Sequence, residues 1–135
     1  MLVRYLSRNE IETINKFLAI KYGFKHLVLQ PGNLDLCVES PRRVVFGTEV
    51  YAGKLEKAAV LMKELNKLHP FLAGNKRTAF LAGTLFLELN SYALSAETAE
   101  AVDLSLRTAS CSADFPDIFN WLKAHSSRSS WEPIE

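Results

Sequence analysis

The chain has 135 residues, of which 48% are hydrophobic and 23% charged, values typical of one globular domain with its own core. The formal net charge is only +1, which argues against a broad surface for binding nucleic acid. The longest apolar stretch, residues 78–89, is too short to cross a bilayer, and the first residues lack a secretory-signal pattern. Two distant cysteines, Cys37 and Cys111, predict reduced, buried thiols, so we expect a soluble cytoplasmic protein.

The first predicted elements are two helices. One covers Arg8–Tyr22, because Ser7 and Glu10 have the spacing of a capping box at its start. Gly23 follows its last turn and is expected to end it. A shorter helix is predicted over Leu34–Glu39.

The next segment, SPRRVVFGTEVY, is predicted to form a short strand or a hairpin flap. β-Branched and aromatic residues at Val44–Phe46 favour an extended backbone, and Pro41 and Gly47 on either side disfavour a helix. No other part of the sequence indicates a strand. The flap is therefore expected to be the single β element of a helical protein.

A strongly helical pattern covers Ala52–His69. One face of this helix is apolar and is expected to be buried; it carries Leu55, Ala58, Ala59, Met62 and Leu65. The opposite face is expected to be solvated; it carries Glu56, Lys57, Lys63, Glu64 and Lys67. On the helical wheel His69 falls within the apolar stripe, which predicts an inward-pointing histidine on the last turn.

The following helix, Asn75–Asn90, is apolar nearly all the way round, so it is predicted to lie at the centre of the fold. Ser95 is expected to cap a helix over Glu97–Thr108, and Asp114 to cap a last helix that ends near His125.

The whole pattern predicts an all-α fold with one small β flap. The expected organisation is a single domain over residues 1–125, followed by a loose tail over residues 126–135.

The loop between the two most apolar helices, in the stretch LHPFLAGNKRTAFLAG, concentrates polar residues. Lys76 and Arg77 stand in the first turn of a helix, where the macrodipole disfavours cations unless an anion is bound. Gly74 allows a phosphate to approach the free amides there, and Asn75 adds a polar side chain. With His69 as a general base, the set suits transfer of a phosphorus group from a nucleotide to an alcohol.

Each of these residues also has a purely structural interpretation when it is taken alone. His69 could be a core histidine, Asn75 an ordinary N-cap, and the pair Lys76–Arg77 a solvated surface feature. Only the spacing of the whole set favours a phosphate site.

This spacing resembles the signature of the Fic/Doc superfamily, H-x-F-x-[D/E]-[A/G]-N-[G/K]-R. The matching positions are His69, Phe71, Gly74, Asn75, Lys76 and Arg77. Lysine at position 76, followed by Thr78 and Ala79, is similar to the Doc (death-on-curing) branch. The order of the other segments is similar as well. The resemblance implies a Fic-like helical bundle with a β-hairpin flap.

The resemblance also implies an activity. Fic proteins move AMP from ATP onto target hydroxyls, whereas Doc-like toxins phosphorylate a threonine of elongation factor Tu and halt translation. By similarity, His69 is the general base, and the nucleotide phosphates are bound by Gly74, Asn75, Lys76 and Arg77. The flap would hold the target by strand pairing through Arg43, Val44, Val45, Phe46, Gly47 and Thr48.

The expected partner is a small Phd-like antitoxin that neutralises the toxin, and nucleic acid is expected only through that antitoxin. No membrane association is expected.

The sequence departs from the family signature at Ala73, where the family has a carboxylate that holds Mg²⁺. Alanine offers no oxygen ligand, so we assign no metal ligand and expect weak or absent activity. Three explanations remain open: a deliberately inactivated chain, a natural degenerate member that binds nucleotide or antitoxin without turnover, or a metal held by other groups.

Overall fold

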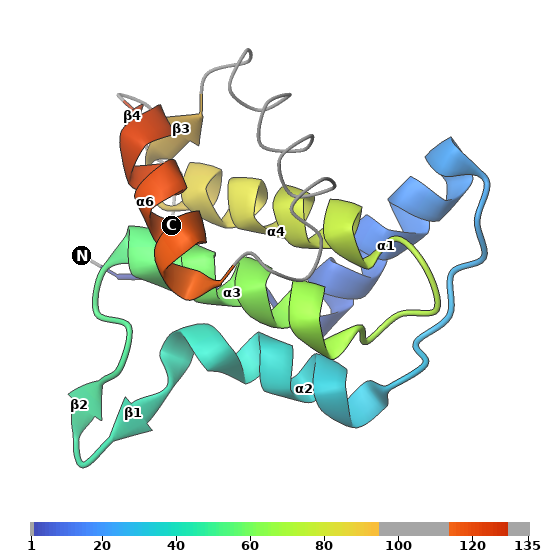
Figure 1. The fold of residues 1–135 in the computed structure, drawn as a ribbon, viewed down its shortest axis with the longest axis horizontal. Helices are drawn as coiled ribbons and strands as arrows, with labels where there is room; N and C mark the ends of the chain where they lie inside the picture. Colours follow the sequence, from blue (N-terminus) through green and yellow to red (C-terminus); the bar gives the residue numbers. More distant parts are fainter. Residues whose placement is uncertain (1, 95–113, 130–135) are drawn as a thin grey trace.

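A computed structural model of the chain describes residues 2–94 and 114–129 and shows a helical fold with two small sheets (Figure 1). In chain order the elements are α1 (Arg8–Tyr22), α2 (Pro31–Glu39), η1 (Ser40–Arg42), β1 (Val44–Val45), β2 (Thr48–Glu49), α3 (Lys54–Leu68), α4 (Asn75–Leu89), β3 (Tyr92–Leu94), α6 (Phe115–His125) and β4 (Ser126–Arg128). The predicted all-α class with a small hairpin is confirmed. The helix predicted over Glu97–Thr108 and its cap Ser95 lie outside the described residues. Across the described ranges, no helix is long and apolar enough to cross a membrane.

The predicted starts of α1 and α6 are confirmed by their hydrogen bonds. Helix α2 begins at Pro31, ahead of the predicted start at Leu34, and α3 begins at Lys54, after the predicted start at Ala52. The Ser7 hydroxyl accepts from the Glu10 amide at 3.1 Å, and the Glu10 carboxylate accepts from the Ser7 amide at 2.8 Å. Gly23 ends α1 in the left-handed region, at φ 76°. Asp114 caps α6 by accepting from the amide of Phe115 at 2.8 Å.

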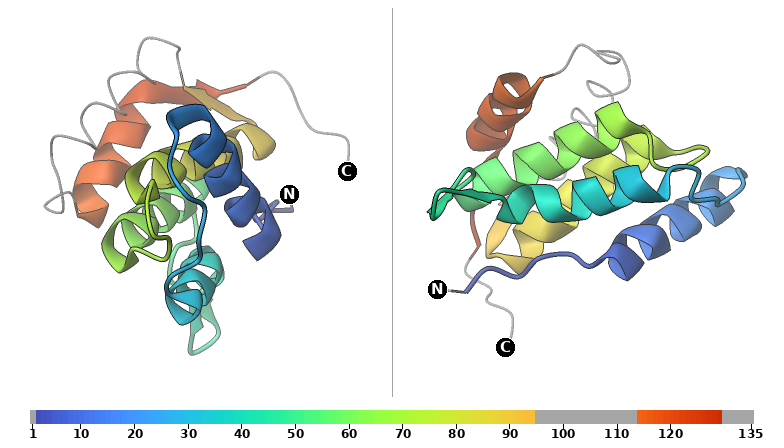
Figure 2. Two further views of the ribbon diagram at one scale, coloured as in Figure 1. Left: turned by 90° about the vertical axis from the view of Figure 1, so that its right-hand side faces the viewer. Right: turned by 90° about the horizontal axis from the view of Figure 1, so that it is seen from below.

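Helix α4 lies at the centre of the fold, between α1 and α3, as the two views of Figure 2 show. Its small residues permit close packing: a Cβ added at Gly83 would come within 2.4 Å of the Met62 side chain on α3. One apolar cluster fills the space among α1, α2, α3 and α4, and a second joins α3 and α4 to α6. The predicted central position of this helix is therefore confirmed.

The far end of α4 is fastened to the N-terminal segment by Asn90. Its side-chain carbonyl accepts from the Arg4 amide at 2.9 Å, and its side-chain amide donates to the Arg4 and Phe86 carbonyls at 2.9 and 2.7 Å. Asn90 is buried, so these bonds satisfy polar groups that water does not reach.

A second sheet corrects the expectation of a single β segment. β3 pairs antiparallel with β4, and the amide of Ser129 continues the contact by donating to the carbonyl of Ser91 at 2.8 Å. The first residues of the expected loose tail are thus an ordered strand, whereas residues 130–135 lie outside the described part. These short strands carry no clear alternation of apolar and polar residues, and the pairing depends on a partner far along the chain.

Lys57 contradicts the predicted solvated face of α3, because its side chain is fully buried. The 3₁₀ turn η1 packs against this side of α3, so the helix is covered on more than one face. Val60 and Leu61, which follow Lys57 by one helical turn, are buried too. The wheel placed the lysine opposite the main stripe but could not show that another element covers it.

The predicted burial of Cys37 on α2 is confirmed. Burial raises the pKa of its thiol to about 12, so the thiol stays protonated near neutral pH. Cys111 lies outside the described residues.

Candidate active site

His69 begins the loop that joins α3 to α4, and its side chain is exposed rather than inward-pointing. The helix ends one residue earlier, at Leu68, and His69 adopts a left-handed conformation with φ 44° and ψ 59°. A residue in that conformation no longer follows the direction set by the helical wheel, which explains why the predicted orientation was wrong. The imidazole forms no hydrogen bond with the described residues, so both nitrogens are free for a reactant.

The rest of the loop is fixed by the segment that follows α1. The carbonyl of Pro70 accepts from the amides of Leu29 and Gln30 at 2.9 and 3.0 Å, and the amide of Leu72 donates to Leu27 at 2.9 Å. Phe71 is buried in the core between these contacts. The loop is therefore held in one conformation by backbone hydrogen bonds.

Asn75 closes the loop on itself. Its side-chain carbonyl accepts from the Phe71 amide at 3.0 Å, and its side-chain amide donates to the Phe71 carbonyl at 2.9 Å. Both polar ends of this buried side chain are thus used within the protein, and the N-cap position belongs to Gly74 instead. The backbone amide of Asn75, at the first position of α4, has no side-chain acceptor among the described residues.

Replacing Asn75 with alanine should lower the free energy of unfolding by about 3 kcal/mol, because a buried amide and a buried carbonyl of Phe71 would both lose their partner. Urea denaturation followed by circular dichroism measures the change. Asn9, an exposed asparagine on α1, offers the matched control, and Asn9→Ala should change stability by no more than about 0.5 kcal/mol. Equal effects of the two substitutions would contradict the closure of the loop by Asn75.

Gly74 allows the backbone to turn into α4. It has φ 76°, and a Cβ at this position would lie 2.3 Å from the ring of Phe24. Among the described residues, no side chain caps the first turn of α4. The first amides of this central helix therefore point out of its start without an intrahelical acceptor, which is the arrangement that binds anions in many proteins.

Two cations stand in this first turn, as the sequence predicts. The guanidinium carbon of Arg77 lies 3.9 Å from the centroid of the Tyr22 ring, and its Nε is buried without a hydrogen-bond partner among the described residues. Lys76 is half-buried and forms no ion pair with any described residue. Two positive charges at the positive end of a helix dipole, neither of them in an ion pair with a described residue, favour a bound anion.

Asn15 supports the site, although the sequence analysis did not single it out. Its buried side-chain amide donates to the Ala73 carbonyl and to the Thr78 hydroxyl, both at 3.0 Å. Its carbonyl oxygen lies 2.7 Å from Nδ1 of His26, so this histidine nitrogen donates. The sequence did contain a signal for this residue: Asn15 lies on the apolar face of α1, four residues after Ile11, and a polar side chain at such a position is expected to be buried and hydrogen-bonded.

The residues at this loop do not fit a magnesium ion. Ala73 has a methyl side chain, and its carbonyl already accepts from Asn15. The side-chain oxygen of Asn75 accepts from Phe71. Within residues 2–94 and 114–129, no three His, Cys, Asp or Glu side chains cluster as metal ligands would.

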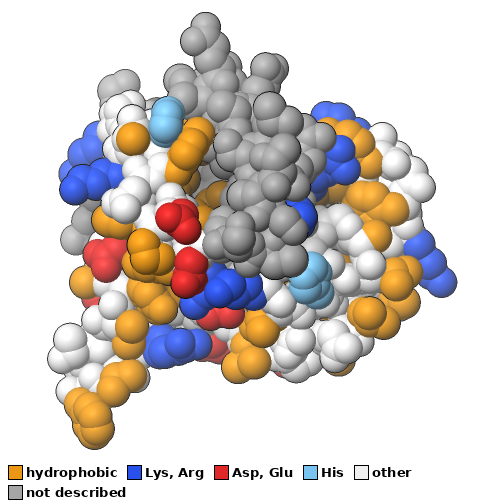
Figure 3. Space-filling model, in the orientation of Figure 1, with side chains coloured by type: hydrophobic (Ala, Val, Ile, Leu, Met, Phe, Trp, Pro, Cys, Tyr) orange, Lys and Arg blue, Asp and Glu red, His pale blue; other side chains and the backbone are white. Residues whose placement is uncertain are grey.

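The predicted flap stands apart from the loop. Figure 1 shows the β1–β2 hairpin at one end of α3 and the loop at the other, and a helix of 15 residues spans about 22 Å. The hairpin is exposed throughout, and its apolar tip projects from the body in Figure 3. The structure thus brings together Gly74, Asn75, Lys76 and Arg77, with His69 at the start of the same loop, but places residues 43–48 elsewhere.

The class of protein is therefore a mainly helical domain with a candidate phosphate site. Its central helix starts at a glycine, and among the described residues this start has no side-chain cap and the histidine at the head of the loop has no hydrogen-bond partner. The comparisons with known proteins then give its family. Residues 5–87 match the Fic/DOC family, and the chain belongs to this family. It is 32% identical to Toxin Doc of Mycolicibacterium smegmatis (strain ATCC 700084 / mc(2)155) over 117 residues, which cover 84% of this chain and 88% of that protein.

Proposed function

We propose that the protein is a Doc-like toxin of a toxin–antitoxin system that transfers a phosphoryl group from ATP to a hydroxyl of a protein target. The observation that carries this proposal is the loop itself, with a free, exposed imidazole at His69 and an uncapped helix start at Gly74. The similarity to Toxin Doc supports the toxin role. A Phd-like antitoxin in the cytoplasm is the partner that this role requires.

In the proposed reaction, His69 takes the proton from the target hydroxyl as its oxygen attacks the γ-phosphorus. A bond forms between that oxygen and phosphorus, the bond between the β- and γ-phosphoryl groups breaks, and ADP leaves. The first amides of α4, Lys76 and Arg77 bind the phosphates and balance their charge. Asn75 holds the loop in shape through its two bonds to Phe71.

The hairpin is proposed to hold the protein target, a threonine-bearing segment such as that of elongation factor Tu. In the described part of the chain β1 and β2 pair only with each other, so each leaves its outer backbone edge free, and Val44, Val45 and Phe46 are exposed beside these edges. Because the hairpin lies at the opposite end of α3, a target held there must extend along this helix to reach His69.

Ala73 favours a second candidate function, that of a non-catalytic member that binds nucleotide or antitoxin. Without a carboxylate at this position, the loop gives Mg²⁺ no side-chain ligand, and transfer should be slow. Transfer of AMP instead of the γ-phosphoryl group is the remaining alternative, since the same amides and cations would bind either part of the triphosphate.

One assay separates these functions. The chain and its Ala73→Asp variant are incubated with Mg²⁺, the elongation factor and ATP that is labelled on either the α- or the γ-phosphate. We expect γ-label on the target, with a rate at least about 100-fold higher for Ala73→Asp. Ala52→Asp, which adds a carboxylate at an exposed loop alanine, is the matched control and should change nothing.

Label from α-ATP alone would identify an AMP transferase and overturn the kinase proposal. No transfer from either variant, together with retained binding of ATP or of an antitoxin, would establish the non-catalytic function.

A further inference from the structure

The geometry points to Lys57 as the residue that positions the β1–β2 hairpin: we propose that its buried ammonium group anchors the hairpin to α3 and so sets where a protein target is held. This inference rests on the proposed function for the role of the hairpin, whereas the anchoring itself rests only on contacts within the chain.

The Nζ of Lys57 contacts the hairpin on both sides of its tip. It donates to the carbonyl of Pro41, in the turn before β1, and to the carboxylate of Glu49 on β2, each at 3.0 Å. The same two contacts fix the start and the end of the hairpin to one point on α3. Since the strands are only two residues long, they give the hairpin little rigidity of their own.

The third side of the ammonium group faces the ring of Tyr5, whose centroid lies 5.5 Å from Nζ. Arg42, at the base of the hairpin, places its guanidinium carbon 4.4 Å from the same ring. The ring also meets Phe86 of α4 edge-on, with 6.3 Å between centroids. The hairpin base is thus connected through Tyr5 to the helix that carries the candidate active site.

Burial makes the lysine costly unless it has a specific use. An ammonium group held away from water loses its hydration, and a buried ion pair often stabilises a fold no more than apolar side chains of similar size would. Here the partner carboxylate is half-exposed while the ammonium group is fully enclosed. An apolar residue could fill the volume on α3, but it could not reach out to bind the hairpin carboxylate.

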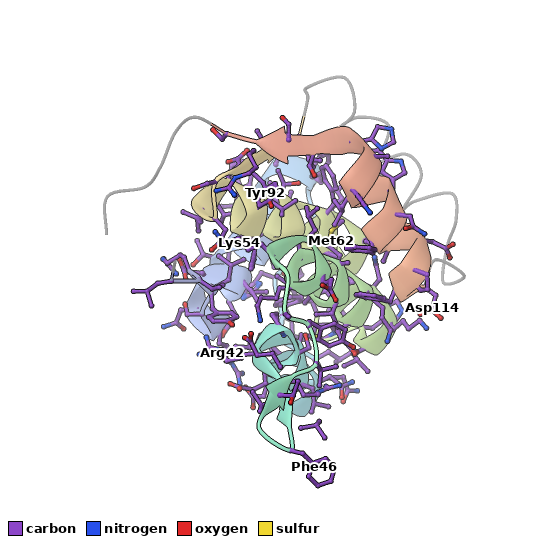
Figure 4. All side chains as sticks on the ribbon, turned by 90° about the vertical axis from the view of Figure 1, so that its left-hand side faces the viewer. Arg42, Phe46, Lys54, Met62, Tyr92 and Asp114 are labelled. Atoms are coloured by element: carbon purple, nitrogen blue, oxygen red, sulfur yellow. The ribbon has the colours of Figure 1, made fainter. Side chains whose placement is uncertain are left out.

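The hairpin needs such an anchor because its own side chains give it no core. Val44, Val45, Phe46 and Val50 are all exposed. Figure 4 shows Phe46 at the tip, directed away from the helices, and Arg42 at the base. The orientation of the hairpin is therefore set at its base, by Lys57 and the stack on Tyr5.

Limited proteolysis tests the anchor without any need for catalysis. Arg42 and Arg43 are exposed trypsin sites at the hairpin base, so the rate of cleavage there reports local opening. We expect cleavage to be about tenfold faster in Lys57→Met and about threefold faster in Glu49→Gln, with unchanged cleavage elsewhere. Lys67→Met, which breaks an exposed ion pair between α3 and Asp114, and Glu39→Gln on α2 are the controls and should leave the rate unchanged.

Glu49→Gln keeps the test valid even if Lys57→Met fails to fold, because Glu49 is half-exposed and lies outside the core. Unchanged cleavage at the hairpin base in Glu49→Gln would overturn the anchor.

Kinetics then test the positioning role, in the Ala73→Asp background if the chain with Ala73 is too slow. We expect Glu49→Gln to raise KM for the protein target about fivefold, while KM for ATP and Tm stay the same. Faster cleavage with an unchanged KM for the target would overturn the role in target positioning. If no variant transfers phosphate, the proposed function fails, but the proteolysis result still decides whether Lys57 anchors the hairpin.

Discussion

Replacing His69 with alanine should lower the rate of transfer to the protein target by about a thousandfold, while the fold and the affinity for ATP stay nearly the same. The side chain is exposed and has no hydrogen-bond partner among the described residues, so its removal leaves no cavity and no unpaired group. Initial rates with labelled ATP, calorimetric titration with ATP and thermal melts measure the three quantities.

Two substitutions in the same loop and helix give the controls for His69→Ala. Leu72→Ala removes another exposed loop side chain and should leave the transfer rate unchanged. Arg77→Ala should weaken ATP binding itself, because Arg77 is proposed to bind the phosphates in the ground state as well as in the transition state. If His69→Ala unfolds the protein, or transfers phosphate at the original rate, His69 is not the general base.

Replacing Gly74 with alanine should lower the free energy of unfolding by about 3 kcal/mol. Two costs add: a non-glycine residue in the left-handed region costs about 1 kcal/mol, and the new methyl group collides with the Phe24 ring, at about 2 kcal/mol. The ring, or the start of α4, must move, so the affinity for ATP should fall too. Chemical denaturation and calorimetry measure both effects.

Gly23→Ala is a closely matched control, because Gly23 has the same φ of 76° but nothing within 4 Å of an added Cβ. It should show the backbone cost alone, about 1 kcal/mol. The double variant Gly74→Ala/Phe24→Leu should recover part of the loss by removing the collision. If Gly74→Ala costs no more than Gly23→Ala, close packing of Phe24 on the loop is not important.

The helices could be predicted from the sequence because their signals are local. The capping box at Ser7, the cap at Asp114 and the apolar character of Asn75–Leu89 each depend on residues within a few turns. The motif could be recognised for the same reason, since its residues lie close together in the sequence, between His69 and Arg77. What the sequence pattern could not supply was the path of the backbone through this segment.

The errors arose where either a distant part of the chain or the exact end of a helix decides the outcome. Lys57 is buried because η1 and β2 cover a face that the wheel leaves to solvent. His69 is exposed because the helix stops at Leu68 and the backbone turns left-handed. The strand β4 forms only because β3 lies beside it. For Lys57 and β4 the local pattern did not contain the contact that decided the outcome, and for His69 it did not show the residue at which the helix ends.

The asparagines at the two ends of α4 have a consequence for the binding of an anion. At the start of the helix, the side chain of Asn75 forms two hydrogen bonds with the backbone of Phe71. At its end, the side chain of Asn90 forms two hydrogen bonds with the backbone of Arg4. Because both ends are held by these hydrogen bonds, the helix has little freedom to shift along its axis or to fray. A triphosphate that binds at the first turn therefore finds the backbone amides of α4 already in place. Little conformational entropy of the protein is lost on binding, so more of the interaction energy contributes to the affinity.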